Sequence, residues 1–341
     1  MRKGTVVFPD AGSIGDDFAW PDFSDFGEVV MYDRTLPEQT EERIRDAAFI
    51  LTKKAGVTAG DPAATPALRY IGALGTGFNH VDIRSAAARG IPVCNVPDYS
   101  TPSVVQHVFT LILLLSSRVC ELSASVRRGG WSKSRHPRYR DKPAFELHGK
   151  TLGIVGFGNI GAGVARVAHG FGMHVLAYAP RPKSAPDFRP FDFVGLNDLF
   201  ARSDVVSLHC PLNRESEGMV DARLLGLMKT QALLINTARG PLVNERDLLD
   251  ALREKRIGGA GLDVVAVEPM ADDNPLRFAP NCMITPHAAW SGVESRMRLM
   301  RIAYDNIRAF LDGAPVNVVN GVARRADQRL SRGANDRIFR A

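Results

Sequence analysis

The stretch that decides the fold is LGIVGFGNIG, residues 152–161. An apolar run of strand-forming residues passes directly into Gly156, Gly158 and Gly161, spaced G-x-G-x-x-G, and a helix-like run, 162–171, follows. The first glycine permits a tight turn, the second lets the backbone approach a pyrophosphate, and the third lets helix and strand pack closely. The N–H groups and dipole of the helix N-terminus then attract phosphates. The motif therefore predicts a dinucleotide site.

Short β-rich runs continue after this motif. With residues 152–155 they make six expected strands separated by helix-like stretches, at 175–178, 205–208, 233–236, 261–264 and 283–285. Such a series completes a mononucleotide-binding, or Rossmann, sheet.

An earlier series has the same alternation. Strands are expected at 6–8, 29–32, 49–51, 70–74 and 93–96, with helices at 37–46 and 81–89. The helix-like run 293–310 and a short strand at 315–319 come after the second sheet is complete, so they are expected to return to the first domain. The predicted fold class is α/β, with two doubly wound parallel-sheet domains. A Rossmann domain, 103–291, is inserted in a flavodoxin-like substrate domain, 1–102 and 292–321, and a basic, frayed tail spans 322–341.

Composition excludes several classes of protein. The chain has 341 residues, of which 45% are hydrophobic and 23% charged, so it is neither disordered nor fibrous. The longest apolar run, 108–115, is too short to span a bilayer, and the N-terminus lacks the apolar core of a secretory signal. The four cysteines are far apart in sequence, and the histidines form no HxH or HExxH pair. We expect a cytoplasmic protein with reduced thiols, no membrane partner and no metal site.

The net charge of +6 is concentrated at the C-terminus. The tail 322–341 carries a net +4 and has almost no aromatic residues between its arginines. Because the rest of the chain is nearly neutral, we expect no nucleic-acid partner. The tail is either a solvated end or an interaction arm.

An apolar run precedes a basic stretch between the two series. Residues 103–117 are helix-like, and 127–142 is rich in arginine and contains Trp131. The basic stretch is either a surface loop or an arm that reaches a partner subunit. Together, the apolar run 108–115 and the arm that contains Trp131 offer more apolar surface than one side of a Rossmann domain usually needs for its own core. This excess predicts a homodimer joined through the dinucleotide domains.

The second strand of the Rossmann series ends without the usual acid. Ala179 stands where an aspartate would hold the ribose 2′-hydroxyl of NAD, and Arg181 and Lys183 follow. A site that lacks the aspartate does not repel the 2′-phosphate of NADPH, and Arg181 and Lys183 would attract it, so the sequence favours NADPH over NADH. The alternative is that both basic side chains are solvated in a loop.

Three charged residues follow the ends of strands in the same series. Arg239 comes after 233–236, Glu268 after 261–264 and His287 after 283–285. The carboxyl ends of parallel strands form the ligand-binding edge of a doubly wound sheet. We therefore expect these three residues to converge beside the dinucleotide.

These motifs, in this order, resemble the D-isomer-specific 2-hydroxyacid dehydrogenases. The resemblance rests on GFGNIG (156–161), NTARG (236–240), GLDV (261–264) with Glu268-Pro269, and TPHAAW (285–290). It covers about residues 5 to 320. LRYIGALGTGFNHVD (68–82) and NVPDYSTPSVVQH (95–107) are most similar to the glycerate dehydrogenase, or hydroxypyruvate reductase, branch.

The resemblance implies a role for each site residue. Arg239 would bind the substrate carboxylate and polarise its carbonyl, and His287 would exchange a proton with the carbonyl oxygen. Glu268 would hold the other imidazole nitrogen and favour the protonated ring. The backbone N–H groups of Thr76 and Gly77 would bind the carboxylate, although Gly75 and Gly77 also fit a plain turn. The remaining cofactor contacts would be Val104, Asn159, Ile160, His209, Cys210, Pro211, Thr237, Ala238, Asp263 and Ala289, with Asp263 facing the nicotinamide carboxamide.

The function implied is reversible hydride transfer between NAD(P) and a small 2-oxo or 2-hydroxy acid. The expected substrates are hydroxypyruvate and glyoxylate, reduced to D-glycerate and glycolate. Two alternatives remain: an NAD(H)-sensing regulatory protein on the same fold, and an enzyme similar to D-3-phosphoglycerate dehydrogenase.

Overall fold

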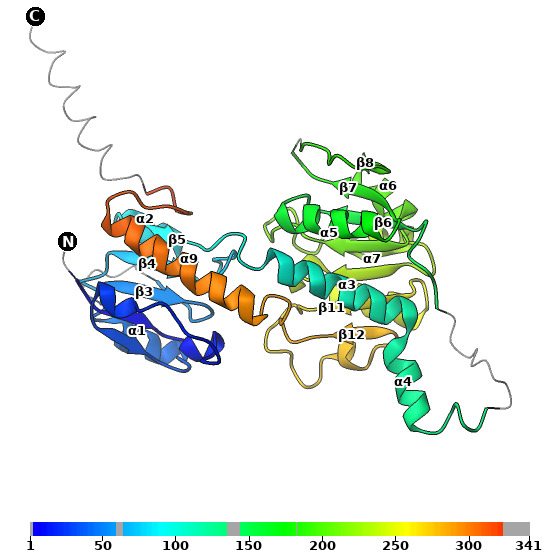
Figure 1. Cartoon of the computed structure of the whole chain (residues 1–341), viewed down its shortest axis with the longest axis horizontal. Helices are drawn as coiled ribbons and strands as arrows, with labels where there is room; N and C mark the ends of the chain where they lie inside the picture. Colours follow the sequence, from blue (N-terminus) through cyan, green and yellow to red (C-terminus); the bar gives the residue numbers. More distant parts are fainter. Residues whose placement is uncertain (1–2, 59–63, 135–143, 182, 323–341) are drawn as a thin grey trace, which may run out of the picture. The chain divides into compact units, whose positions relative to one another are not determined.

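The computed structural model describes residues 3–58, 64–134, 144–181 and 183–322. Contacts divide the chain into two compact units. Unit 1 comprises Met1–Ser100 and the chain from Gly292 on, and unit 2 comprises Thr101–Ser291. Unit 2 is thus inserted into unit 1 along the sequence, as the colours of Figure 1 show. Apart from Val322, the predicted basic tail lies outside the described residues.

The sheet of unit 1 has five parallel strands in the order β2-β1-β3-β4-β5. They are β1 (Val6–Phe8), β2 (Val29–Met31), β3 (Phe49–Thr52), β4 (Tyr70–Ala73) and β5 (Val93–Cys94). All residues of β1, β3, β4 and β5 are buried, which explains why these strands are continuous apolar runs. The strand order is the flavodoxin-like one, so this part of the fold prediction is confirmed.

The described residues of unit 1 also form three helices and three 3₁₀ turns. The helices are α1 (Thr40–Ile44), α2 (Ile83–Ala88) and α9 (Val293–Leu311); the turns are Ala11–Ser13, Phe23–Phe26 and Pro37–Gln39. Helix α9 contacts β4, so the chain does return to the first domain (Figure 1). The prediction of a strand at 315–319 is wrong. Only an isolated bridge joins Val318 to Cys94, since Asn317, with φ of +57°, interrupts the extended run.

The sheet of unit 2 has seven parallel strands in the order β12-β11-β10-β9-β6-β7-β8. They are β6 (Thr151–Val155), β7 (His174–Tyr178), β8 (Phe191–Phe193), β9 (Val205–Leu208), β10 (Leu233–Asn236), β11 (Gly259–Leu262) and β12 (Cys282–Ile284). This is the Rossmann order with one additional strand, and the order reverses between β6 and β9.

The predicted total of six strands is too low because β8 was missed. This edge strand has only three residues, follows Pro190 and buries only Phe191, so it has no apolar run to signal it. Strand β11 also begins two residues earlier than expected, at Gly259.

Helices cover both faces of this sheet. They are α3 (Thr101–Ser117), α5 (Asn159–Gly170), α6 (Leu196–Arg202), α7 (Ala222–Leu227) and α8 (Glu245–Arg253). Helix α4 (Val119–Arg127) follows α3 and extends away from the sheet (Figure 1), and 3₁₀ turns lie at Gly240–Leu242 and Pro275–Phe278. Helices α3 and α5 lie side by side (Figure 1) and share one apolar core with the sheet, whereas α6, α7 and α8 share another.

The apolar run 108–115 lies mainly inside unit 2. Val108, Leu111 and Ile112 are buried, and α3 contacts β10 and β11. Exposed apolar side chains of unit 2 include Val119 and Val126 on α4, which has no buried residue, and Val267 and Phe278 elsewhere. Among the described residues no single helix is long and apolar enough to cross a membrane. The helices α3 and α4, which are bent by 57° relative to each other, together have the length and apolar composition of a membrane span, but only by these two criteria.

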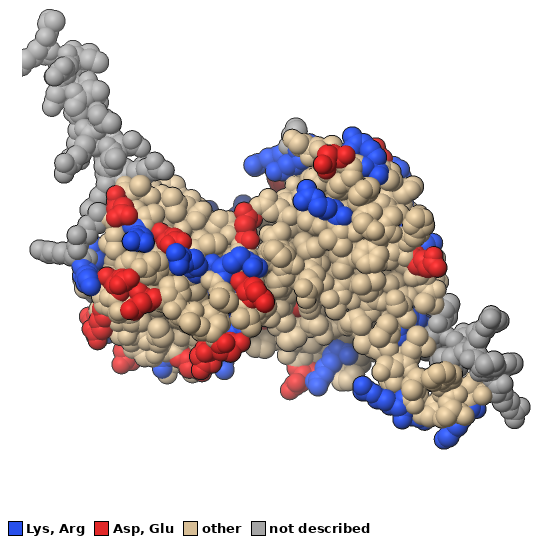
Figure 2. Space-filling model, in the orientation of Figure 1, with Lys and Arg blue, Asp and Glu red and all other residues tan. Residues whose placement is uncertain are grey.

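Charged side chains of both signs are distributed over the surface. On the face drawn in Figure 2, lysines and arginines are interspersed with aspartates and glutamates on each unit. No broad basic surface is visible there among the described residues.

Candidate active site

The glycine turn between β6 and α5 has the shape that the motif predicts. Gly156 has φ of +98°, and a Cβ there would lie 2.6 Å from the backbone nitrogen of Cys210. A Cβ on Gly161 would overlap the carbonyl oxygen of Gly156. Around the Cβ position of Gly158, by contrast, no heavy atom of the described residues lies within 4 Å, its neighbours along the chain aside. Helix α5 begins at Asn159, so its first N–H groups border this open space, which suits a pyrophosphate.

His209 and Cys210 form the other side of this turn, after β9. The His209 N–H donates to the Val155 carbonyl at 2.7 Å, and its imidazole Nε2 lies 2.8 Å from Ser207 Oγ. Burial lowers the pKa of His209 to about 3 and raises the pKa of Cys210 to about 11. Both predicted cofactor residues are therefore uncharged at neutral pH, and they lie where the strand order reverses.

The loop after β10 holds Arg239 in place. The buried Asn236 side chain donates to the Arg239 carbonyl at 2.9 Å and accepts from the Ala238 N–H at 3.0 Å. The half-buried Arg239 guanidinium donates to the Ala238 carbonyl at 2.6 Å. Gly240 is required because a Cβ there would overlap the carbonyl group of Val265. The asparagine and glycine thus fix the backbone from which the guanidinium extends.

The hydroxyl of Thr237 is buried and has no hydrogen-bond partner among the described residues. Thr237 lies in the same loop and is only 9% exposed. A buried hydroxyl without a partner costs free energy, so the position suits a polar group of a bound ligand. This orphaned atom and the open space above Gly158 are the two observations that fit a dinucleotide here.

His287 and Glu268 form the pair that the sequence predicts. His287 Nδ1 lies 2.7 Å from Glu268 Oε2, and both side chains are about 30% exposed. Because a carboxylate only accepts, Nδ1 carries the hydrogen and donates it. This contact fixes the ring orientation and leaves Nε2 as the atom available for proton transfer.

Asp263 positions the loop that carries His287. Its carboxylate, 1% exposed, accepts from the N–H groups of Ala288 and Ala289 at 2.8 and 2.9 Å and from the Thr285 hydroxyl at 2.6 Å. Its carbonyl accepts from the His287 N–H at 2.7 Å. His287 has φ of +53°, a left-handed conformation that a histidine rarely adopts without such support.

His107 joins this network, which the sequence analysis missed. Its Nε2 lies 2.9 Å from Thr285 Oγ1 and 3.5 Å from Asp263 Oδ1. The only signal was a histidine within the otherwise apolar helix α3. The predicted contact between Asp263 and the nicotinamide carboxamide stays a prediction.

The other predicted cofactor residues lie at several places in unit 2. Val104 and Ala289 are buried in one cluster, and Ser103 Oγ donates to the Ala289 carbonyl at 2.8 Å. Ile160 is half-buried, and Pro211, after β9, is exposed. Arg181 and Lys183 are exposed and follow β7.

Thr76 and Gly77 belong to unit 1, in the loop after β4. Thr76 Oγ1 donates to the Val96 carbonyl at 3.3 Å, and Asn95 Nδ2 donates to the Thr76 carbonyl at 2.9 Å. The loop is thus anchored to the segment after β5. The predicted binding of a carboxylate by its N–H groups stays a prediction.

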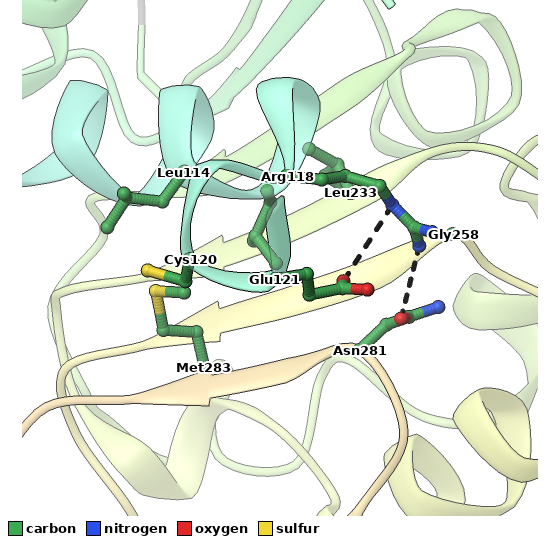
Figure 3. A pocket seen from close by; sticks show the side chains of 9 residues that line it. Leu114, Arg118, Cys120, Glu121, Leu233, Gly258, Asn281 and Met283 are labelled. Atoms are coloured by element: carbon green, nitrogen blue, oxygen red, sulfur yellow. Dashed lines mark hydrogen bonds and ion pairs between the residues drawn. The ribbon is translucent and has the colours of Figure 1, made fainter. Parts of the chain in front are cut away.

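A small cavity lies at the opposite, amino edge of the unit 2 sheet (Figure 3). It measures about 40 Å³, and its lining includes Leu114, Cys120 and Met283. Arg118, at the break between α3 and α4, donates to Asn281 Oδ1 at 3.2 Å beside it. The cavity lies at the edge of the sheet opposite to the glycine turn and His287, so it is separate from the candidate active site.

The predicted family is confirmed by comparison with known proteins. Residues 109–289 match the NAD-binding domain of the D-isomer-specific 2-hydroxyacid dehydrogenases. The chain belongs to this family. This 2-hydroxyacid dehydrogenase is 42% identical to a hydroxypyruvate reductase of Blautia hydrogenotrophica over 307 residues, which cover 89% of the chain and 95% of the relative. It is 39% identical to a glycerate dehydrogenase of Methylorubrum extorquens, with 92% and 98% covered.

Solved structures agree with this assignment. The crystal structure of an NADPH-dependent glyoxylate/hydroxypyruvate reductase from Sinorhizobium meliloti, in complex with NADP and malonate, matches with a TM-score of 0.82 at 26% identity. The match covers 95% of this dehydrogenase and 99% of that chain. The chain is thus an NAD(P)-dependent oxidoreductase that acts on CH–OH groups of 2-hydroxy acids, in the glycerate dehydrogenase and hydroxypyruvate reductase branch as predicted.

Proposed function

We propose that the enzyme reduces hydroxypyruvate and glyoxylate to D-glycerate and glycolate, with NADPH as the preferred cofactor. The observation that carries the proposal is the His287–Glu268 pair, at 2.7 Å, at the carboxyl edge of the sheet that also bears the glycine turn. The names of the two relatives support this choice of substrates.

Each residue of the proposed active site has its own role. Arg239 binds the substrate carboxylate with two parallel hydrogen bonds and polarises the adjacent carbonyl. The N–H groups of Thr76 and Gly77 contribute to carboxylate binding. His287 donates the proton on Nε2 to the carbonyl oxygen and takes it back in the reverse direction. Glu268 accepts from Nδ1 and so holds the ring with Nε2 toward the substrate.

The dinucleotide supplies the hydride when bound. We propose that Gly156, Gly158, Asn159, Ile160 and Gly161 hold its pyrophosphate, and that Val104, His209, Cys210, Pro211, Thr237, Ala238, Asp263 and Ala289 form the rest of its site. Arg181 provides the contact to the 2′-phosphate. The enzyme is also proposed to be a cytoplasmic homodimer, joined through unit 2.

Turnover decides between this proposal and a regulatory protein. The purified chain is assayed with hydroxypyruvate and glyoxylate, each with NADPH and with NADH. We expect sustained oxidation of NADPH with both acids. Tight nucleotide binding without turnover of either acid would instead favour an NAD(H)-sensing protein.

A further inference from the structure

One face of helix α3 meets β11 and the loop that carries His287. Leu111 on this face lies against Gly261 of β11, where a Cβ would come within 3.0 Å of the Leu111 Cβ. The missing side chain at Gly261 therefore lets the helix approach the strand closely. Because positions four apart share one face of a helix, His107 and Ser103 continue this face toward the N-terminus of α3.

His107 contacts the loop through Thr285. Its Nε2 lies 2.9 Å from Thr285 Oγ1, which in turn lies 2.6 Å from Asp263 Oδ1. The hydroxyl has a single hydrogen and the carboxylate only accepts, so Thr285 donates to Asp263 and accepts from His107. The imidazole therefore carries a hydrogen on Nε2, and the three side chains form one directed chain that ends on the buried carboxylate.

The same helix holds the other end of the loop. Ser103 Oγ donates to the Ala289 carbonyl at 2.8 Å, and the Ala289 N–H donates to Asp263 Oδ2 at 2.9 Å. Residues 285–289 are thus fastened to α3 at both ends, with His287 in the middle. Its φ of +53° is uncommon for a residue other than glycine and persists only where surrounding contacts hold it. Helix α3 therefore supplies support on both sides of this strained residue.

We propose that His107 is a positioning residue for the reaction. Through Thr285 and Asp263 it holds the loop in place. His287 then keeps the left-handed conformation from which its Nδ1 donates to Glu268. This inference rests on the proposed function, in which His287 transfers the proton, and every residue of the chain of contacts belongs to unit 2. Because proton transfer needs an accurately placed imidazole, loss of the His107 contact lowers kcat more than binding of substrate or cofactor.

Paired substitutions of His107 test this role. His107→Phe keeps a ring but removes the donor, so it should lower kcat for hydroxypyruvate by about 10- to 100-fold, while KM and the NADPH Kd change by less than about threefold. His107→Gln restores an N–H donor near the position of Nε2 and should recover most of kcat. His169→Phe, the same change on helix α5, where the ring stacks on Phe188, is the matched control and should leave kcat unchanged.

A double-mutant cycle tests whether His107 acts through Thr285. Thr285→Val keeps the shape of the side chain but removes the hydroxyl, whereas Thr285→Ser keeps the hydroxyl and should retain most of kcat. Because both single changes break the same chain, the variant with His107→Phe and Thr285→Val together should lose little more kcat than the worse single variant. Losses that multiply would overturn the proposal, and so would a folded His107→Phe variant with kcat within a few-fold of wild type. If His107→Phe does not fold, Thr285→Val breaks the same chain and takes its place.

A spectroscopic measurement separates this inference from the proposed function. Long-range proton–nitrogen correlation spectra of protein labelled with ¹⁵N at histidine report the tautomer and surroundings of each imidazole, and His287→Ala identifies the signals of His287. These signals should shift or broaden in His107→Phe, recover in His107→Gln and stay as in the wild type in His169→Phe. Unchanged His287 signals in His107→Phe overturn the positioning role even if hydroxypyruvate is reduced. Shifted signals in an enzyme that reduces neither hydroxypyruvate nor glyoxylate refute only the proposed function.

Discussion

At the scale of single residues, His287 depends on two neighbours for its chemistry. Glu268 sets its tautomer at 2.7 Å, and Asp263 holds its backbone in the left-handed region. Neither neighbour is close to His287 in sequence, so the orientation of this imidazole is set by contacts between loops that follow two different strands.

Replacing His287 tests its role in proton transfer. His287→Ala should lower kcat by about 10²- to 10⁴-fold, the usual contribution of a general acid. The NADPH Kd should change little because the glycine turn is untouched. Steady-state kinetics and fluorescence titration measure the two quantities. A kcat within a few-fold of wild type would contradict the assignment.

Arg239 is expected to act through the shape of its guanidinium as well as its charge. Arg239→Lys replaces a planar fork by a point charge, so KM for hydroxypyruvate should rise and kcat should fall. The half-buried loop around Asn236 should keep its structure. An unchanged kcat/KM in initial-rate assays would exclude Arg239 from the substrate site.

At the scale of elements, the loop after β7 is proposed to select the cofactor. Ala179 cannot accept from a ribose 2′-hydroxyl, and Arg181 is exposed two residues later. Arg181→Ala should reduce the preference for NADPH over NADH by about 10- to 100-fold in kcat/KM. Lys183→Ala is the matched variant with a smaller expected effect. Preference for NADH in the wild type would reject the idea.

The segment after β9 should make stability depend on pH. The pKa of His209 is lowered from 6.5 to about 3 by burial, so between these values the unfolded chain binds a proton that the folded chain excludes. Stability contributed by the neutral ring is complete above pH 6.5 and is lost as the pH falls toward 3. Over that range His209 should contribute about 1.4 kcal/mol per pH unit to the slope of the unfolding free energy.

Denaturant unfolding between pH 7 and pH 4 measures this slope in wild type and in His209→Gln, where it should be shallower. His174→Gln, at an exposed position of β7, is the control and should follow the wild type. Identical slopes in wild type and His209→Gln would show that His209 titrates normally.

At the scale of the whole molecule, α4 and the residues after it leave apolar side chains exposed. Val119 is 50% exposed, Val126 51% and Trp131 59%. Such an unpartnered apolar surface is typical of an interface, so we expect a homodimer with twice the chain mass of 37.2 kDa. Light scattering at micromolar concentration measures it. Val126→Asp should yield monomers, and a monomeric wild type would refute the proposal.

Much of the molecule follows from local sequence patterns. Continuous apolar runs between helical stretches predict parallel strands, because both faces of such strands are buried. The turn at Gly156 and Gly161 is equally local, since its shape excludes a Cβ at both positions. The order of Arg239, Glu268 and His287 after successive strands predicts one shared edge of a sheet. These features could therefore be predicted without coordinates.

Other features depend on contacts between residues distant in sequence. Strand β8 forms because its three residues pair with β7. The apolar run 108–115 belongs to the core because helix α3, which contains it, packs on the sheet. The link from His107 to Asp263 joins helix α3 to the loop after β11. The sequence by itself determined the fold class, since this follows from local periodicity, and it predicted the catalytic residues through the order of motifs that resemble the family. Only tertiary structure decided how the loop that carries His287 is held, because packing of helix α3 and the loop after β11 brings His107, Asp263 and Thr285 together.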